Sequence, residues 1–346
     1  MITYGYVNNV SEVEGAKKSY GVYNSDNNSV KLFVFGDSYV DTGNYLNSTS
    51  YKSPNGITFP GHPSGRFGNG HILTDYLASF FKIGNPTPYA LKNSSNLQNG
   101  MNFAFGGTGV FKTMIDGPNL TVQIDSFEQL IKQNVYSKSD VESSIVLVNT
   151  GSNDYITFLL KDKNLIGIAK YIKSLGDEFS INLKRIHSLG ANKIIVSLLE
   201  PMGCYPAISV ASSYHDCINQ LNKVSRYHNK MILQNVEGLN KKSGKLVFTT
   251  LDLYNSFLST IKDMQKSHQE NSTLMNPLQP CCAPVKGVYE CGTVDENGKN
   301  EYNLCKKPEL SFFWDIVHPS QNGWYSIFKK LEPSLSQITG TNFLSL

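Results

Sequence analysis

Short apolar runs alternate along the chain with longer segments of helical periodicity. Each run is rich in aliphatic and aromatic residues and is too short for a typical helix, which predicts a buried strand. The helical segments carry apolar residues three and four positions apart. The predicted strands cover residues 31–36, 101–105, 144–149, 192–199 and 245–250, and the predicted helices cover residues 72–81, 124–135, 166–189, 213–239 and 321–337.

This alternation predicts a fold class. Buried strands separated by helices imply βαβ crossovers and a parallel sheet that is covered on both faces. We therefore predict an α/β protein with a mainly parallel central sheet. Residues 1–29 show no clear period and are predicted to form an N-terminal extension. No repeat or linker divides residues 30–346, which we expect to form a single domain with an elaborated loop at 277–307.

Charge and hydropathy exclude two kinds of partner. The net charge is +3, and charged residues make up 17 % of the chain. The lysines are scattered rather than gathered in a basic stripe, so we expect no nucleic-acid partner. No stretch approaches the roughly 18–20 apolar residues of a membrane-spanning helix. We expect a monomer.

Six cysteines lie on stretches rich in proline, glycine and tyrosine. An even, clustered set predicts disulfides and an oxidising compartment. A zinc site is the alternative, but no Cys-x₂-Cys pair is present. The six residues allow 15 pairings, and geometry disfavours a bond between two adjacent cysteines. They are Cys204, Cys217, Cys281, Cys282, Cys291 and Cys305.

Six acceptor motifs for N-glycosylation favour the same compartment. Residues 1–28 lack the apolar core of a signal peptide, which taken alone favours an intracellular protein. The cysteines and the acceptors together favour secretion or another compartment of the secretory pathway, which is our prediction. The acceptors are Asn9, Asn27, Asn47, Asn93, Asn119 and Asn271.

Ser38 follows the first apolar run and is a candidate nucleophile, because α/β enzymes present such groups where a buried strand ends. Asp315 and His318 are three positions apart and lie on the same side of a turn or helical segment. This spacing lets a carboxylate orient an imidazole that faces a serine. The alternative is that Asp315 caps the following helix and that His318 is a surface residue.

Two further strand ends carry candidate donors to a developing oxyanion. Asn153 follows the strand at 144–149 and offers a carboxamide N–H. Gly107 follows the run at 101–105, and a glycine lets a backbone N–H approach a ligand closely. Taken singly, both could be ordinary turn residues. Because an open parallel sheet gathers its strand ends at one edge, we expect these residues to meet Ser38.

Other enzyme classes fit less well. The Gly107–Gly109 segment lacks the third glycine of a dinucleotide-binding loop, and no Gly-x-Ser-x-Gly elbow of an α/β-hydrolase surrounds Ser38. The remaining histidines show no metal-ligand spacing, and we interpret them as loop or surface residues. They are His62, His71, His187, His215, His228 and His268.

The ordered motifs resemble those of the plant GDSL esterase/lipases, members of the SGNH hydrolase superfamily. Tyr39 stands where the family name has leucine, and the resemblance covers residues 31 to about 330. The four motif blocks are residues 35–44, 101–109, 151–154 and 315–319.

The resemblance implies a three-layer α/β/α fold of the flavodoxin-like type and a secreted serine esterase or lipase. It assigns Ser38 as the nucleophile, His318 as the base and Asp315 as the residue that orients His318. The backbone N–H groups of Ser38 and Gly107 and the side chain of Asn153 would form the oxyanion hole. The implied reaction is hydrolysis of a small-molecule or lipid carboxylic ester through an acyl-enzyme, with no metal or cofactor.

Several alternatives stay open at this point. Gly106 adjoins Gly107 and could take its place in the oxyanion hole. An acyltransferase would use the same acyl-enzyme with a different acceptor. A non-catalytic binding protein could keep the same fold, although the complete set of site residues argues against it.

Overall fold

A computed structural model of the chain describes residues 30–162, 164–271, 274–287 and 290–339. The extension predicted at 1–29, with the acceptors Asn9 and Asn27, lies outside these residues.

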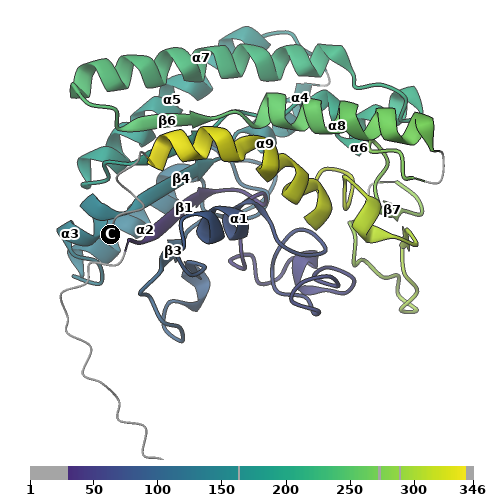
Figure 1. Ribbon diagram of the computed structural model, residues 1–346, viewed down its shortest axis with the longest axis horizontal. Coiled ribbons are helices and arrows are strands. Elements are labelled where there is room, and N and C mark those ends of the chain that lie inside the picture. The colour runs from purple at the N-terminus through teal and green to yellow at the C-terminus, as the bar shows by residue number, and fades with distance from the viewer. Residues whose placement is uncertain (1–29, 163, 272–273, 288–289, 340–346) are drawn as a thin grey trace, which may run out of the picture.

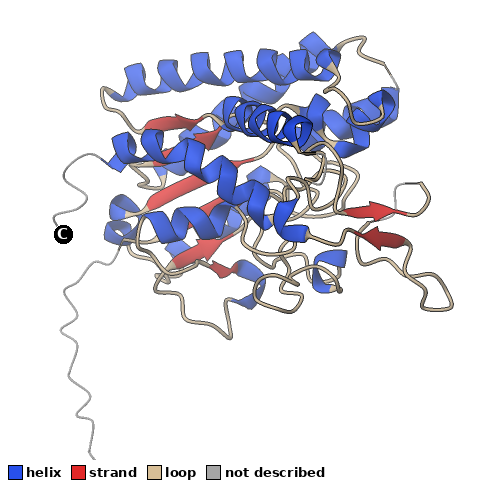
Figure 2. Cartoon of the chain, turned by 45° about the vertical axis from the view of Figure 1, so that its right-hand side comes forward, coloured by secondary structure: helices blue, strands red, loops and turns tan. Residues whose placement is uncertain are grey.

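A six-stranded parallel sheet forms the centre of the protein (Figures 1 and 2). In spatial order its strands are β2 (Thr87–Pro88), β3 (Gly100–Asn102), β1 (Leu32–Gly36), β4 (Ile145–Asn149), β5 (Ile194–Ser197) and β6 (Phe248–Leu251). Every neighbouring pair is parallel. Without the short β2, the order is the doubly wound order of flavodoxin-like proteins. The predicted α/β class is confirmed.

Helices cover the sheet in two layers, which makes three layers in all (Figure 1). One layer consists of α1 (Leu73–Phe80), α8 (Leu253–Glu270) and α9 (Gln321–Thr339), and the other consists of α2 (Leu120–Lys132), α5 (Ile168–Ser188) and α7 (Asn219–Ser243). Three shorter helices are α3 (Lys138–Ser143), α4 (Ser152–Asp162) and α6 (Pro206–Ser209). In Figure 1, α8 and α9 run across the front of the sheet, and α5 lies behind it.

The strand β1 shows why the predicted strands are unbroken apolar runs. All five of its residues are buried. Phe33 and Phe35 both pack on Phe127 of α2, with ring centroids 4.7 and 5.5 Å apart. Because helices cover both faces of a parallel sheet, neither face of the strand carries polar side chains.

Helix boundaries and number differ from the prediction in places. The helix α2 begins four residues earlier than predicted, because the Asn119 side chain caps it by accepting a hydrogen bond from the Val122 N–H at 3.1 Å. The helix α7 begins six residues later, because Ser213 and Tyr214 have positive φ angles that no helix continues through. The helices α4 and α8 were not predicted.

The cysteines form three disulfides, as predicted, and none is left to bind zinc. Two of the bonds tie the loop at 277–307, where β7 (Cys282–Pro284) and β8 (Tyr302–Leu304) pair as an antiparallel hairpin. Disulfides are consistent with the secretory pathway, and the location itself stays a prediction. The pairs are Cys204–Cys217, Cys281–Cys305 and Cys282–Cys291.

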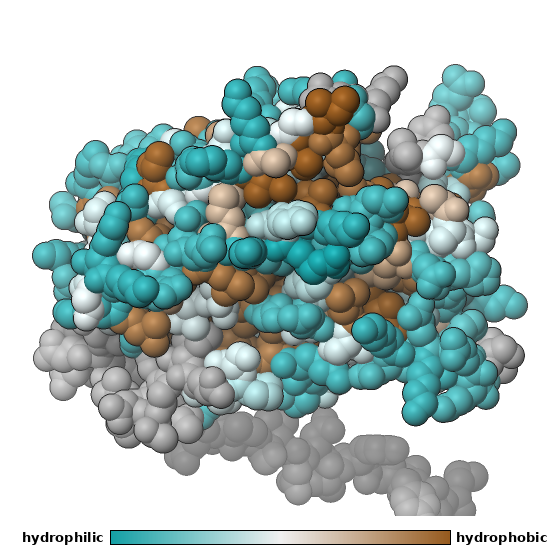
Figure 3. Space-filling view, turned by 90° about the horizontal axis from the view of Figure 1, so that it is seen from above, coloured by the Kyte–Doolittle hydropathy of each residue, from teal (hydrophilic) through white to brown (hydrophobic). Residues whose placement is uncertain are grey.

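The surface over α7 is mostly hydrophilic (Figure 3). Two large side chains of α7 are exposed, Tyr227 at 64 % and Leu233 at 45 %. Within the described ranges, no helix combines the length and the hydropathy that crossing a bilayer requires.

Candidate active site

Three neighbouring strands bring the candidate residues together. Ser38 follows β1, Gly107 follows β3, and Asn153 lies in the first turn of α4, which follows β4. The strand β1 lies between β3 and β4, so this edge is the switch point at which doubly wound sheets bind ligands. Asp315 and His318 come from the loop before α9. All five residues line one cleft.

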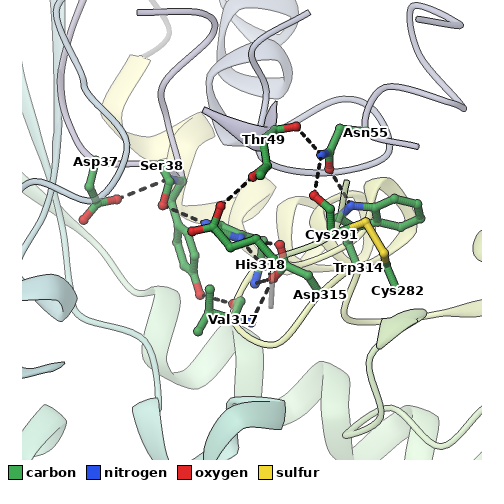
Figure 4. A network of polar contacts seen from close by, with 12 residues as sticks. Asp37, Ser38, Thr49, Asn55, Cys282, Cys291, Trp314, Asp315, Val317 and His318 are labelled. Carbon is green, nitrogen blue, oxygen red and sulfur yellow. Dashed lines mark hydrogen bonds and ion pairs between the residues drawn. A yellow bond between two sulfur atoms is a disulfide. The ribbon is translucent and has the colours of Figure 1, made fainter. Parts of the chain in front are cut away.

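A chain of hydrogen bonds joins Ser38, His318 and Asp315 (Figure 4). The Ser38 Oγ lies 2.8 Å from His318 Nε2, and His318 Nδ1 lies 2.7 Å from Asp315 Oδ2. A carboxylate can only accept, so Nδ1 carries the proton and leaves Nε2 of a neutral imidazole free to accept from the serine hydroxyl. The alternative of a surface histidine is wrong, since His318 is only 9 % exposed.

Asp315 is held by its own turn. Its Oδ1 accepts hydrogen bonds from the backbone N–H groups of Val317 at 2.9 Å and His318 at 2.7 Å. Burial alone would raise the pKa of Asp315, but the His318 imidazole and these N–H groups outweigh burial and hold that pKa below its ordinary value. Asp315 is therefore ionised at neutral pH.

Aromatic rings fix the position of the imidazole. The Phe67 ring stacks on His318 with centroids 5.3 Å apart, and the Tyr39 ring meets it edge-on at 5.8 Å. The Tyr39 hydroxyl also donates to the Val317 carbonyl at 2.8 Å. Tyr39 thus packs against the imidazole and holds the backbone next to it, a role that sequence reasoning missed.

The backbone contacts distinguish the two adjoining glycines. The N–H of Gly106 donates to Asp41 Oδ2 at 2.9 Å and is therefore occupied. Within the described chain, the N–H groups of Gly107 and Ser38 donate no hydrogen bond. Gly107 has a φ of +80°, which glycine adopts without strain. The Asn153 carboxamide donates one hydrogen bond to the Thr108 carbonyl at 3.0 Å and keeps a second N–H.

Two buried carboxylates, those of Asp41 and Asp154, hold the segments that carry the candidate oxyanion donors. Asp41 accepts from Gly106 and also from the N–H groups of Gly43 and Asn44 that follow Ser38. Burial raises the pKa of Asp41 to about 6, against the opposing effect of these N–H groups.

Asp154 holds the loop after Gly107 through hydrogen bonds from its backbone. It accepts from the N–H groups of Val110 at 2.9 Å and Phe111 at 2.8 Å, so it ties that loop to α4. Burial raises the pKa of Asp154 to about 6 as well. Sequence reasoning missed both acids, although each stands inside a recognised motif.

A cluster of buried acids lies beneath the site. Burial raises the pKa of Asp37 well above its ordinary value, and the negative Glu200 raises it further. Burial likewise raises the pKa of Glu200, which accepts a hydrogen bond from the Tyr205 hydroxyl. The signal for Glu200 was an acid directly after the strand predicted at 192–199.

His228 corrects the prediction that the other histidines are loop or surface residues. It is 2 % exposed and lies on α7, with Nδ1 2.9 Å from the Tyr155 hydroxyl. Burial lowers its pKa to about 3, so it is neutral at physiological pH. It is a core residue of the helix layer.

The cleft has a volume of about 360 Å³. Among the described residues, no group of His, Cys, Asp and Glu side chains is placed to hold a metal ion. The chemistry that the arrangement can perform is proton transfer between Ser38 and His318 next to unoccupied N–H donors.

Fold and site together define the class: a flavodoxin-like α/β protein with a hydrogen-bonded serine, histidine and aspartate at the carboxyl edge of its sheet. Residues 32–331 match the family model described as GDSL-like Lipase/Acylhydrolase. The chain belongs to this family, as the resemblance predicted. It is a hydrolase of the GDSL esterase/lipase kind, and the prediction of a carboxylic ester hydrolase is confirmed at that level.

Relatives from Arabidopsis thaliana agree with this assignment. GDSL esterase/lipase At5g03610 is 41 % identical over 333 residues, with 94 % of this chain and 92 % of the relative covered. GDSL esterase/lipase At3g09930 is 43 % identical over 315 residues, with 89 % of each covered. Among solved structures, the lipase Lip_vut3 from a goat rumen metagenome aligns over 88 % of this chain and 97 % of its own, with 12 % identity and a TM-score of 0.41.

Proposed function

We propose that the protein hydrolyses carboxylic esters through an acyl-enzyme formed on Ser38. The observation that carries this proposal is the hydrogen-bonded chain from Asp315 through His318 to Ser38, which opens into the cleft. A serine hydroxyl is a weak nucleophile unless an adjacent base removes its proton, and His318 Nε2 at 2.8 Å is such a base.

The reaction proceeds in two halves. As His318 takes the hydroxyl proton, Ser38 Oγ attacks the ester carbonyl, and ionised Asp315 stabilises the imidazolium that forms. The tetrahedral intermediate then collapses, and His318 protonates the departing alcohol. Water, activated by the same imidazole, attacks the acyl-enzyme and releases the acid.

Three donors stabilise the oxyanion in both halves. They are the N–H groups of Ser38 and Gly107, which are unoccupied in the described chain, and the second N–H of the Asn153 carboxamide. The ties from Asp41 and Asp154 hold these donors in place before the ester arrives. Preorganised donors of this kind need no rearrangement during the reaction.

A serine-directed organophosphate tests the proposal directly. Because the reagent needs an activated serine, we expect it to phosphorylate Ser38 stoichiometrically and to abolish turnover of a p-nitrophenyl ester. Mass spectrometry of the digested protein identifies the labelled residue. Labelling of a different serine together with loss of activity would move the site, and absence of labelling would favour a binding protein that keeps the fold.

Replacing Asn153 tests the oxyanion hole. We expect Asn153→Ala to lower kcat on p-nitrophenyl esters by about 10²–10³-fold, since it removes one of three donors. The control is Asn255→Ala, an exposed asparagine in the first turn of α8, which should leave kcat unchanged. Equal rates for the two variants would exclude Asn153 from the oxyanion hole.

A further inference from the structure

We propose that the site acts on medium-chain acyl esters of polyhydroxylated alcohols. This inference rests on the proposed function and adds the substrate class. It comes from the cleft around Ser38, whose two walls differ in chemistry.

The first wall is apolar and begins at the oxyanion donors. Ile156 and Leu160 lie three and seven positions after Asn153 on α4, so the three share one face of the helix. At 1.5 Å per residue, this row extends about 10 Å from Asn153. Met114 and Ile115 from the loop after Gly107 line the same cleft.

This apolar wall is unusually open to solvent. Leu160 is 59 % exposed and Met114 is 62 % exposed, although both line the cleft. Exposed apolar side chains that line one cleft are typical of a surface that a ligand covers. A row about 10 Å long fits an acyl chain of intermediate length along α4.

The lining also includes Thr49 and Glu290, which we call the polar wall. The Thr49 hydroxyl donates to Glu290 Oε2 at 2.6 Å. The other oxygen of this carboxylate can accept a hydrogen bond from a hydroxyl.

A buried asparagine holds the polar wall in place (Figure 4). Asn55 is 4 % exposed, and its carboxamide donates to the carbonyls of Thr49 at 2.8 Å and Cys291 at 3.2 Å. Its oxygen accepts from the Trp314 indole N–H at 2.8 Å. Asn55 thereby joins both segments of the wall to the residue that precedes Asp315.

The mechanism decides which part of the ester meets which wall. The carbonyl oxygen must face the donors of Gly107 and Asn153, and the departing oxygen must lie within reach of His318. The alcohol therefore lies on the side of His318, where Trp314 and Asn55 connect to the polar wall. The acyl chain extends the other way, along Ile156 and Leu160.

The volume of the cleft limits the size of the substrate. A cleft of about 360 Å³ lies near the lower end of ligand pockets, which span about 300–1,000 Å³. A long-chain triglyceride presents apolar chains to both walls and exceeds this volume. An acetylated sugar leaves the apolar wall uncovered. An octanoyl ester of glycerol satisfies both walls.

The acyl side is tested with p-nitrophenyl acetate and p-nitrophenyl octanoate. We expect kcat/KM for octanoate to exceed that for acetate by about tenfold or more, because several methylenes are buried and each contributes. Leu160→Gln should reduce this ratio several-fold. The control Leu246→Gln changes a leucine that is 77 % exposed and does not line the cleft, and it should leave the ratio unchanged.

The alcohol side is tested by comparing mono-octanoyl glycerol with octyl octanoate, which share the acyl group. We expect the glycerol ester to be preferred, and Glu290→Gln to reduce that preference about tenfold, since hydrogen bonds to a charged group are the stronger kind. Glu296→Gln is the control, because Glu296 is an exposed acid on the same disulfide-tied loop that does not line the cleft.

The results separate this inference from the proposed function. Hydrolysis that depends on Ser38 but favours acetate, or that favours octyl octanoate over the glycerol ester, would overturn the substrate class alone. Absence of ester turnover together with absence of organophosphate labelling at Ser38 would overturn the proposed function. A preference for octanoyl glycerol that Leu160→Gln and Glu290→Gln both weaken would support the substrate class.

Discussion

Ser38→Ala is expected to lower kcat for a p-nitrophenyl ester by on the order of 10⁶-fold, which leaves only the slow hydrolysis that needs no serine nucleophile. The variant lacks the Oγ that lies 2.8 Å from His318 Nε2, so no acyl-enzyme can form. The fold should persist, because the change deletes one atom at the edge of a cleft. Burst kinetics and steady-state rates measure the effect.

Ser139→Ala is the matched control. Ser139 is exposed on α3, and its replacement should change neither kcat nor the thermal unfolding temperature. If Ser38→Ala kept the turnover of the unsubstituted protein while both variants unfolded at the same temperature, Ser38 would not be the nucleophile. A loss of activity accompanied by unfolding would require the organophosphate experiment to decide.

Much of the fold could be predicted because its strands are buried on both faces. Continuous apolar runs such as β4 mark such strands directly. The helix α4 was missed because only two residues separate it from β4, so the polar residues at its start were interpreted as a turn. The helix α8 was missed although it has a cap signal, the Asp252 side chain that accepts from the Asn255 N–H.

The candidate site was predictable to the extent that motifs encode it. The sequence placed Ser38, Asn153 and His318 at strand ends or in a loop, and the topology of a parallel sheet explains why they meet. The roles of Asp41 and Asp154 were not predictable, because each accepts hydrogen bonds from backbone groups more than forty residues away. No local pattern reports such contacts.

The choice between Gly106 and Gly107 shows the same limit. Motif position favoured Gly107, but both glycines were compatible with the sequence. The distinction depends on a hydrogen bond of 2.9 Å from the Gly106 N–H to Asp41, sixty-five residues away along the chain. Because a donor that is already occupied cannot stabilise an oxyanion without losing its partner, the contact favours Gly107.

Asp315→Asn is expected to lower kcat by about 10⁴-fold, less than Ser38→Ala, because the nucleophile and the oxyanion donors remain. The asparagine oxygen can still accept from the N–H groups of Val317 and His318, so the turn should persist. The NH2 group that then faces His318 Nδ1 can only donate, which favours the wrong tautomer of the imidazole and leaves no negative charge to stabilise the imidazolium.

Asp295→Asn is a matched control, since Asp295 Oδ1 also accepts from two backbone N–H groups, those of Asn297 and Lys299, at 2.9 and 2.8 Å. It should match the turnover of the unsubstituted protein. The kcat and the thermal unfolding temperature of both variants together separate an effect on the orientation of His318 from an effect on folding. If Asp315→Asn were as active as Asp295→Asn, His318 would act without a charged partner. A large loss at unchanged thermal stability would instead require that this carboxylate, and not the turn that it closes, supports the base.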